Sequence, residues 1–397
     1  MERVGIYGGT YNPPHIGHIR AAEYALHSLK LSKLLMIPSC ISPHKVLPAD
    51  SATPEQRLTM LQLSTRQIPG ITVSDLELRR GSTSYTYQTV EQVSELYPDA
   101  ELVLLMGTDM FLSFDRWRNP ERILAKASLG VFYRGDPEEK QQIQAKKAFF
   151  EAQGAKVYLV ENPVTEISST QLRRMLVFGC ADPFLEPETA QFIRREGLYH
   201  TDENLKGLSM EQLEQTVIAL LKPSRVAHVL GCRDTAGELA QRYGADPTEA
   251  RRAALLHDIT KALDGPLQLT LCREYGITLD EFFTQNPKTL HALTGALVAQ
   301  RIFGETPAVV SAIRNHTTGK PAMNTLEKII YVADYVEPNR DFPGVEKLRS
   351  LAYTDLDAAL QLGLEMTLAM LKEQGREVSP ESAQALEYLQ KNSDRKE

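Results

Sequence analysis

Apolar and polar positions follow two different patterns along the chain. Over the first 200 residues, short β-rich runs bounded by turns appear at RVGIYGG, KLLMIPS, GITVSDLEL, ELVLLMGTD, ASLGVFYR and KVYLVE. Helical patterns such as HIRAAEYALHSL and TPEQRLTMLQLST lie between several of them. Strands that alternate with helices predict βαβ units and a parallel sheet. The pattern closes at TAQFIRREGLYH, a predicted helix that Gly197 stops.

The pattern changes near residue 200. The stretch HTDENLKGL, from His200 to Leu208, is polar and predicts a linker. Beyond it there is almost no strand signal, and apolar residues recur every three and four positions, which predicts helices. We therefore expect an α/β domain at residues 1–200 and an all-α domain at residues 205–390. A chain of 397 residues is long enough for two or three domains of ~150 residues.

Composition narrows the classes of function. A net charge of −7 argues against a protein that binds nucleic-acid polymers regardless of their sequence. No apolar run reaches the ~18 residues of a membrane helix, so we expect no membrane partner. The cysteines at 40, 180, 232 and 272 form no CxxC pair, which predicts reduced thiols and a cytoplasmic protein. The sequence leaves open whether the chain forms an oligomer.

The first candidate site is the string GGTYNPPHIGH, from Gly8 to His18. Gly8 and Gly9 end the first predicted strand, and we expect a helix to begin near His18. In an open parallel sheet, ligands bind where strands end and helices begin. The N-terminus of a helix offers free N–H groups and a partial positive charge, which suit a phosphate. His15 and His18 would add donors at the same place.

Further strings in the same predicted domain suit a nucleotide. ISSTQLRR, from Ile167 to Arg174, places three hydroxyl residues ahead of a helix that carries Arg173 and Arg174 in its first turns. Hydroxyls at an N-cap together with a guanidinium group can hold a pyrophosphate. SPHK offers Lys45 to an acceptor phosphate, and TSYTYQT is a hydroxyl-rich run that enters a helix. Trp117 is a flat aromatic residue that could stack on a pyridine ring.

These strings together resemble the nicotinate-nucleotide adenylyltransferases, in which HxGH and ISSTxLR are signature motifs. The resemblance covers about residues 3–200 and implies a Rossmann-like nucleotidyltransferase domain that uses ATP with Mg²⁺ and nicotinate mononucleotide. Nicotinamide mononucleotide is the alternative acceptor. The resemblance implies catalytic roles for His15 and His18, ATP contacts from Gly8, Gly9, Thr10, Asp109, Ser168, Ser169, Thr170 and Arg173, and acceptor contacts from Lys45, Thr86 and Trp117.

The second candidate site combines histidines and aspartates of the predicted all-α domain. The four histidines of residues 201–397 lie in predicted helices or at their ends. His257 and Asp258 are adjacent, and neighbours on a helix diverge by ~100°, so they can reach one metal centre from two directions. Asp334 stands in an otherwise apolar helix, where a carboxylate without a cation is costly.

The order H…HD…H…H…D resembles the HD phosphohydrolase superfamily. The sequence around these residues resembles the YqeK-type branch, in the strings SRVAHVLGC, AALLHDITK, AIRNHTTG and YVADYVEPNR. Enzymes of that branch split diadenosine tetraphosphate, a dinucleoside polyphosphate, into two ADP. This resemblance covers about residues 209–380 and implies two divalent metals, of iron, manganese or zinc. A nucleotide-sensing regulatory module and the hydrolysis of another nucleotide are the alternatives.

The resemblance also implies roles for single residues. We expect the first metal on His228, His257, Asp258 and Asp334, with Asp258 as a bridge to a second metal on His291 and His316. Lys261 is the candidate catalytic cation and Arg314 a candidate phosphate contact, and Arg340 would lie at the lip of the pocket.

Overall fold

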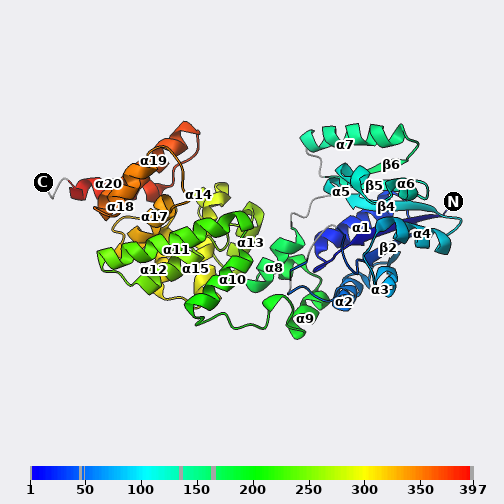
Figure 1. The fold of residues 1–397 in the computed structure, drawn as a ribbon, viewed down its shortest axis with the longest axis horizontal. Helices are drawn as coiled ribbons and strands as arrows, with labels where there is room; N and C mark the ends of the chain where they lie inside the picture. The colour runs from blue at the N-terminus through cyan, green and yellow to red at the C-terminus, as the bar shows by residue number, and fades with distance from the viewer. Residues whose placement is uncertain (1, 44–46, 49, 134–136, 162–166, 394–397) are drawn as a thin grey trace. The chain divides into compact units, whose positions relative to one another are not determined.

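The chain folds into two compact units. The computed structural model describes residues 2–43, 47–48, 50–133, 137–161 and 167–393. The units are Met1–Glu203 and Asn204–Glu397 (Figure 1). The first combines a sheet with helices, and the second is helical in its described part. The predicted fold classes are therefore confirmed. The predicted bounds of 1–200 and 205–390 lie close to this division and stay a prediction.

A parallel six-stranded sheet forms the centre of the first unit, in the order β3-β2-β1-β4-β5-β6. Its strands are β1 (Arg3–Gly9), β2 (Lys33–Pro38), β3 (Ile71–Val73), β4 (Glu101–Gly107), β5 (Ala127–Tyr133) and β6 (Val157–Glu161). The strand order reverses at β1, where Tyr7 pairs with Met36 of β2 on one side and with Leu105 of β4 on the other. Such a reversal opens a crevice at the carboxyl ends of β1 and β4.

The first unit has helices on both faces of this sheet, and further helices pack beside them. They are α1 (Ile16–Ser28), α2 (Pro54–Thr65), α3 (Leu76–Arg80), α4 (Thr86–Leu96), α5 (Thr108–Leu112), α6 (Pro120–Leu124), α7 (Pro137–Glu151), α8 (Ser169–Val177) and α9 (Pro187–Arg195), with short 3₁₀ turns at Phe114–Arg116, Asp182–Phe184 and Leu198–His200. Successive strand residues point to opposite faces. Leu35 therefore packs in the core that contains Val90 of α4, and Leu34 in the core that contains Ala22 of α1.

Two predicted boundaries in this unit can be compared with the structure. α1 begins at Ile16, close to the predicted start near His18, and the carbonyl of His15 accepts the N–H groups of His18 and Ile19. The run GITVSDLEL is a strand only at Ile71–Val73, and its second half forms α3. The side chain of Ser74 accepts the N–H of Leu76 there, and such a local bond favours a helix start over a continued strand.

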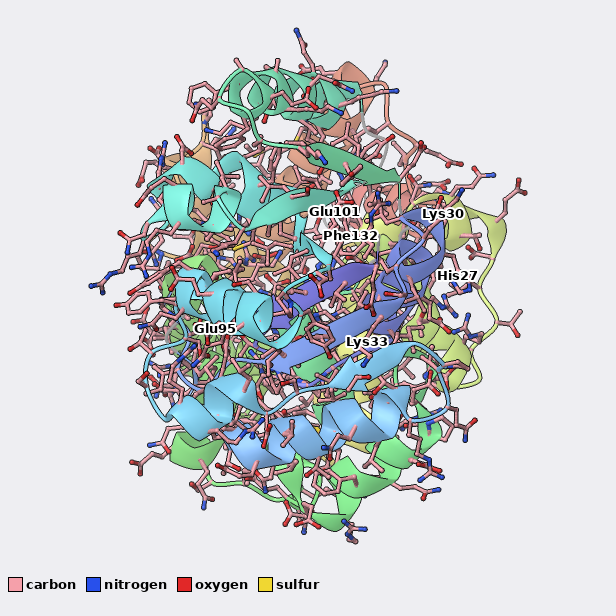
Figure 2. The ribbon with its side chains drawn as sticks, turned by 90° about the vertical axis from the view of Figure 1, so that its right-hand side faces the viewer. His27, Lys30, Lys33, Glu95, Glu101 and Phe132 are labelled. Atoms are coloured by element: carbon pink, nitrogen blue, oxygen red, sulfur yellow. The ribbon has the colours of Figure 1, made fainter. Side chains whose placement is uncertain are left out.

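One carboxylate ties four strands together at the amino edge of the sheet, where Figure 2 labels Glu101. Glu101 at the start of β4 accepts hydrogen bonds from Arg3 of β1 at 3.0 Å and Tyr158 of β6 at 2.8 Å, and from Ser128 of β5 at 3.3 Å. Burial works to raise the pKa of Glu101, but the bonds from Tyr158 and Arg3 outweigh it and lower that pKa. The candidate site lies at the opposite edge of the sheet, at the carboxyl ends of the strands.

The second unit is a bundle of helices. They are α10 (Met210–Leu220), α11 (Pro223–Tyr243), α12 (Pro247–Leu256), α13 (Gly265–Glu274), α14 (Glu281–Gln285), α15 (Leu290–Arg301), α16 (Pro307–Asn315), α17 (Thr325–Val336), α18 (Val345–Ala352), α19 (Leu356–Glu373) and α20 (Pro380–Ser393), with a 3₁₀ turn at Pro287–Thr289. α11, α12, α15, α16 and α17 pack on one another. The predicted helix near the chain end is present as α20.

One helix of this unit is shorter than predicted. The run PTEARRAALLHDITKAL forms α12 only as far as Leu256, and His257, Asp258 and Lys261 follow it in a tight turn. There the N–H of Ile259 bonds to the carbonyl of Leu256, and the N–H of Lys261 to that of Asp258. These bonds span three residues instead of four, which tightens the backbone beyond an α-helix.

Two composition-based expectations can be compared with the structure. Among the described residues, no helix combines the length and the apolar character that a membrane span requires. Cys40, Cys180, Cys232 and Cys272 all carry free thiols.

We predict that Leu129→Ala destabilises the first unit by about 2–5 kcal/mol, because it removes a fully buried side chain and leaves a cavity. Chemical denaturation followed by tryptophan fluorescence measures this, since Trp117 is the single tryptophan and lies in the first unit. Leu96→Ala is the control, because Leu96 is 64% exposed and its loss should cost about 0.5 kcal/mol or less. Equal midpoints for the two variants would contradict this account of the core.

Candidate active sites

A cavity of about 930 Å³ lies at the carboxyl ends of β1 and β4. Its lining includes every candidate residue of the first unit that the structure describes: Gly8, Gly9, Thr10, His15, His18, Thr86, Asp109, Trp117, Ser168, Ser169, Thr170 and Arg173. Lys45 lies outside the described residues. A cavity of this volume accommodates a small-molecule ligand.

The two glycines at the end of β1 line the cavity. A Cβ atom at Gly8 would meet nothing within 4 Å, so the space next to this residue is open to the cavity that it lines. A Cβ atom at Gly9 would lie 2.9 Å from the ring of Tyr11, so the glycine makes room for that ring. Tyr11 donates a hydrogen bond to the carbonyl of Tyr7 at 2.8 Å, and the edge of its ring packs on His18.

The two histidines form a close pair of tilted rings at the start of α1. The ring centroids of His15 and His18 are 3.6 Å apart. Burial lowers the pKa of His15 to about 4, so its imidazole is neutral near pH 7. Nδ1 of His18 accepts the backbone N–H of His15 at 3.2 Å. In the tautomer of His18 that accepts this bond, the ring proton lies on Nε2, which can donate to a phosphate oxygen in the cavity.

Two hydrogen bonds fasten the start of α8 to the loop after β1. The hydroxyl of Ser169 donates to the carbonyl of Pro13 at 2.9 Å, and Arg173 donates to the carbonyl of Asn12 at 2.7 Å. Ser168 caps the helix by accepting the N–H of Gln171. The HxGH and ISSTxLR strings, far apart in the sequence, thus meet in one site, with a helix N-terminus from each.

The sequence analysis missed residues that hold this loop in place. The buried Arg57 of α2 donates to the carbonyls of Thr10 and Ser39, each at 2.7 Å, and burial lowers its pKa. Tyr199 donates to the side-chain carbonyl of Asn12 at 2.7 Å. No signal marked these residues, because neither their type nor their spacing reveals which distant carbonyl they reach.

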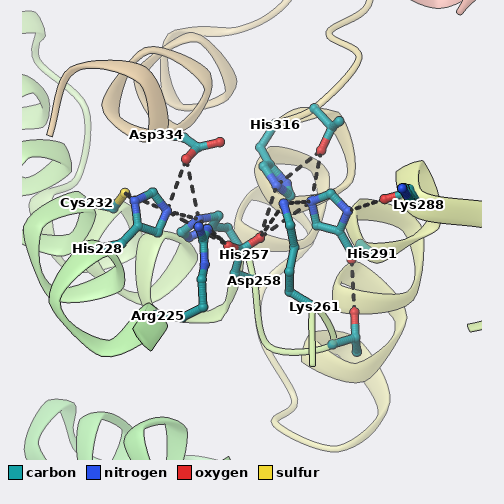
Figure 3. A network of polar contacts seen from close by, with 12 residues as sticks. Arg225, His228, Cys232, His257, Asp258, Lys261, Lys288, His291, His316 and Asp334 are labelled. Atoms are coloured by element: carbon teal, nitrogen blue, oxygen red, sulfur yellow. Dashed lines mark hydrogen bonds and ion pairs between the residues drawn. The ribbon is translucent and has the colours of Figure 1, made fainter. Parts of the chain in front are cut away.

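Asp258 lies at the centre of the second site (Figure 3). Its Oδ2 atom is 3.8 Å from Nε2 of His228 and 3.6 Å from Nε2 of His257. Its Oδ1 atom is 3.4 Å from Nε2 of His291 and 3.9 Å from Nε2 of His316. Each carboxylate oxygen therefore faces a different pair of histidines.

The sixth candidate ligand joins the Oδ2 side of this cluster. Oδ1 of Asp334, on α17, lies 3.1 Å from Nε2 of His228 and 3.9 Å from Nε2 of His257. Burial acts to raise its pKa, but the hydrogen bond from His228 and the charge of Arg340 hold the pKa of Asp334 well below its usual value. The structure thus brings all six predicted metal ligands together.

Backbone carbonyls fix the orientation of three histidines. Nδ1 of His257, His291 and His316 lies 2.6, 2.9 and 2.7 Å from the carbonyls of residues 254, 288 and 313. These bonds place the proton on Nδ1 and leave the lone pair of Nε2 facing the cluster. Burial lowers the pKa of His291 to about 4 and that of His316 to about 3. Both rings are therefore neutral near pH 7, the form that binds metals.

These residues fit a divalent metal. Burial alone would raise the pKa of Asp258, but His257, Lys261 and His291 lower it, so the carboxylate is charged. Its Oδ1 atom is buried and accepts no hydrogen bond from the described residues. Ligand atoms of His228, Cys232, His257 and Asp334 lie within 4.8 Å of one another, as do those of His257, Asp258 and His316. Such nitrogen and oxygen donors suit iron, manganese or zinc.

The predicted cations differ in their surroundings. Nζ of Lys261 lies 3.5 Å from Oδ1 of Asp258 and 3.0 Å from Nε2 of His291. Arg340 forms an ion pair with Asp334. Arg314 instead contacts Glu381 of α20 at 3.5 Å and lies over the ring of Phe283, so its role as a phosphate contact stays a prediction.

Glu337 is a buried carboxylate that the sequence analysis did not single out. Its Oε1 atom lies 3.0 Å from Nδ1 of His228, and its Oε2 atom accepts the backbone and side-chain N–H groups of Asn339 at 2.7 and 2.8 Å. A carboxylate behind a histidine orients the ring and makes it a stronger metal ligand. The EPNR string that contains it gave no signal for this role, because the contact depends on the approach of α11.

Comparisons with known proteins give a match for each unit. A cytidylyltransferase-like family model matches residues 6–175, and an HD domain model matches residues 225–339. Over 199 residues the chain is 37% identical to a probable nicotinate-nucleotide adenylyltransferase of Rhodopirellula baltica, covering 49% of this chain and 92% of that protein. Over 170 residues it is 41% identical to a symmetrical bis(5'-nucleosyl)-tetraphosphatase of Halalkalibacterium halodurans, covering 42% of this chain and 90% of that protein.

A solved structure is among those that match the second half of the chain. It is described as a predicted HD superfamily hydrolase involved in NAD metabolism from Clostridium acetobutylicum. Its sequence identity is 36% and its TM-score is 0.46, and the match covers 47% of this chain and 98% of that structure.

We predict that Glu337→Gln weakens metal binding about 10-fold, because the amide keeps the shape but removes the charge behind His228. Titration against a competing chelator measures the affinity, and thermal unfolding checks the fold. Glu238→Gln on the exposed side of α11 is the control, and its affinity should equal that of the wild type. Wild-type affinity in Glu337→Gln would show that this carboxylate does not act on the metal site.

Proposed function

The chain joins a domain of the nicotinate-nucleotide adenylyltransferase family to an HD-domain hydrolase related to the symmetrical bis(5'-nucleosyl)-tetraphosphatases, and from this premise we propose the reactions of both units. The first unit transfers the adenylyl group of ATP to nicotinate mononucleotide, a step of NAD biosynthesis. The second unit hydrolyses diadenosine tetraphosphate to two ADP.

The adenylyl transfer is supported by the cavity that the described candidate residues line together. A phosphate oxygen of the acceptor attacks the α-phosphorus of ATP, the bond to the β-phosphate breaks, and pyrophosphate leaves. Because the attacking oxygen is already a nucleophile, the protein has to align the reactants and stabilise charge. His18 donates to the α-phosphate, and Arg173 with the start of α8 holds the departing pyrophosphate. Mg²⁺ accompanies the phosphates of ATP.

The acceptor end of the cavity favours a carboxylate-bearing pyridine. Thr86 stands at the first position of α4, where free N–H groups and a partial positive charge suit an anion. Trp117 lines the same cavity and packs on Phe114 at 5.2 Å, so its ring is held in place for stacking on the pyridine. Nicotinate offers the carboxylate that this helix start can bind, and nicotinamide offers a neutral amide.

We predict that the wild type forms dinucleotide faster from nicotinate mononucleotide than from nicotinamide mononucleotide, and that His18→Ala lowers kcat by about 100-fold or more through loss of a charge-stabilising donor. Steady-state kinetics with ATP and each acceptor measures both. His27→Ala is the control, because His27 lies on the same helix, is exposed, and bonds to the carbonyl of Glu23. An unchanged kcat in His18→Ala would remove this residue from the mechanism.

The hydrolysis is supported by the position of Asp258, whose two oxygens each face a separate pair of histidines. His228, His257, Asp258 and Asp334 would hold one divalent ion, and Asp258, His291 and His316 a second. Two ions in such a site supply activation of water and neutralisation of phosphate charge. Water adds its oxygen to one of the two central phosphorus atoms, the bridging P–O bond breaks, and each half leaves as ADP. Lys261 holds phosphate oxygens beside Oδ1 of Asp258.

We predict that Asp258→Ala empties the whole metal site, whereas His316→Ala leaves one of the two ions. Both variants should lose hydrolysis, because charge neutralisation needs both ions. Both should retain adenylyl transfer, because the two units have separate cores. Elemental analysis and chromatography of nucleotide products measure these outcomes.

The products also show which P–O–P bridge of the substrate is cleaved. Two ADP from diadenosine tetraphosphate support the symmetrical reaction, and ATP with AMP contradicts it. Full metal content in a folded Asp258→Ala variant would overturn the ligand assignment.

A further inference from the structure

Arg225 reaches into the metal site from the first turn of α11. Its guanidinium group forms an ion pair with Oδ2 of Asp258, the oxygen that faces His228 and His257 (Figure 3). The side chain is 25% exposed, so it also borders solvent. Its Nε atom is buried and has no hydrogen-bond partner among the described residues. The guanidinium group therefore has donor capacity that this ion pair does not use.

Lys261 stands in a matching position on the other side of Asp258. Its Nζ atom lies 3.5 Å from Oδ1, the oxygen that faces His291 and His316. Each oxygen of Asp258 thus has one pair of histidines and one cation. Figure 3 shows Arg225 and Lys261 on the two sides of the carboxylate.

The charge of Arg225 is not balanced once Asp258 binds metals. A guanidinium group stays protonated at any physiological pH. When the oxygens of Asp258 coordinate divalent ions, Arg225 faces positive charge, and like charges at a few ångströms repel. Arg252, by contrast, pairs with the carboxylate of Glu305, which the proposed site does not use. Another anion would balance Arg225, because a partly buried cation without a partner is costly.

We propose that Arg225 is a substrate-binding residue of the hydrolase site and holds the phosphates on the His228 side of the bond that breaks. Lys261 holds those on the His291 side. This inference rests on the proposed hydrolysis and assigns a phosphate contact to each side of the cleaved P–O–P bridge. The planar guanidinium group can offer two parallel N–H groups to one phosphate, a geometry that suits recognition of a polyphosphate chain.

A counter-ion role for Arg225 makes different predictions from a substrate-binding role. If Arg225 only neutralises Asp258, then its removal is harmless once metals are bound, because they take over the neutralisation. If Arg225 binds phosphate, its removal leaves the metals in place and weakens nucleotide binding. Metal content and nucleotide affinity together separate the two roles without relying on turnover.

The test compares Arg225→Met and Arg225→Lys with the wild type in the full chain. Arg233→Met is the matched control, since Arg233 lies on the same helix, is 20% exposed and pairs with Glu214 and Asp234. Metal content is measured by elemental analysis. The affinity of the metal-loaded protein for ADP is measured by calorimetry. Steady-state kinetics with diadenosine tetraphosphate as substrate gives kcat/KM.

For Arg225→Met we expect wild-type metal content, ADP affinity about 10-fold weaker or more, and kcat/KM about 100-fold lower, the scale of lost charge-assisted hydrogen bonds. Arg225→Lys should recover part of the ADP affinity, because it restores the charge without the paired donors. Arg233→Met should match the wild type in all three measurements.

Wild-type ADP affinity in Arg225→Met, or loss of its metal, would overturn the proposal. If Arg225→Met does not fold, Arg225→Lys decides: weaker ADP binding with full metal content supports the proposal, and wild-type binding contradicts it. If the wild type does not cleave diadenosine tetraphosphate, the proposed function fails. The ADP and metal measurements on the variants still test Arg225 in that case.

Discussion

A buried charge must be balanced by another charge or by hydrogen bonds, and this constraint explains how the centre of the second unit is built. Asp258 is completely buried, and its carboxylate is surrounded by four imidazoles and two cationic side chains. Helices α11, α15 and α17 and the residues that follow α12 and α16 meet around it, since each contributes a group that faces the carboxylate or its neighbour Asp334. The helices could not pack in this way around an apolar centre, because their polar groups would then lack partners.

In the first unit the charge to be balanced is that of the proposed ligand, and main-chain dipoles of helices are placed to balance it. Helices α1, α4 and α8 all begin at the cavity, so their free N–H groups supply positive potential without a formal charge. Burial keeps His15 neutral, which lets it sit against His18 without repulsion between two imidazolium ions. Such a site can accept a highly charged ligand without carrying a large charge of its own.

Both sites depend on groups that never touch the reacting atoms. Arg57 holds the carbonyls of Thr10 and Ser39, and Glu337 holds His228 from behind. In each case a single buried side chain fixes a backbone or ring position that a flexible loop would not hold by itself. The rigidity of the sites therefore comes from contacts between elements, and the local sequence of the motif supplies only the reactive groups.

The sequence by itself determined the elements and the chemistry of this protein. Apolar spacing marked all six strands and the change to helices near residue 200, because that spacing follows from the local geometry of the backbone. HxGH, ISSTxLR and the HD set named the groups that meet in each site, because reactive residue types are visible without a structure. The apolar spacing did not reveal the end of α12 at Leu256, and the contacts of Arg57, Tyr199, Glu337 and Arg225 were decided only by the tertiary structure. Each of these contacts joins groups far apart in the chain, and their meeting depends on how the elements pack, which no local pattern encodes.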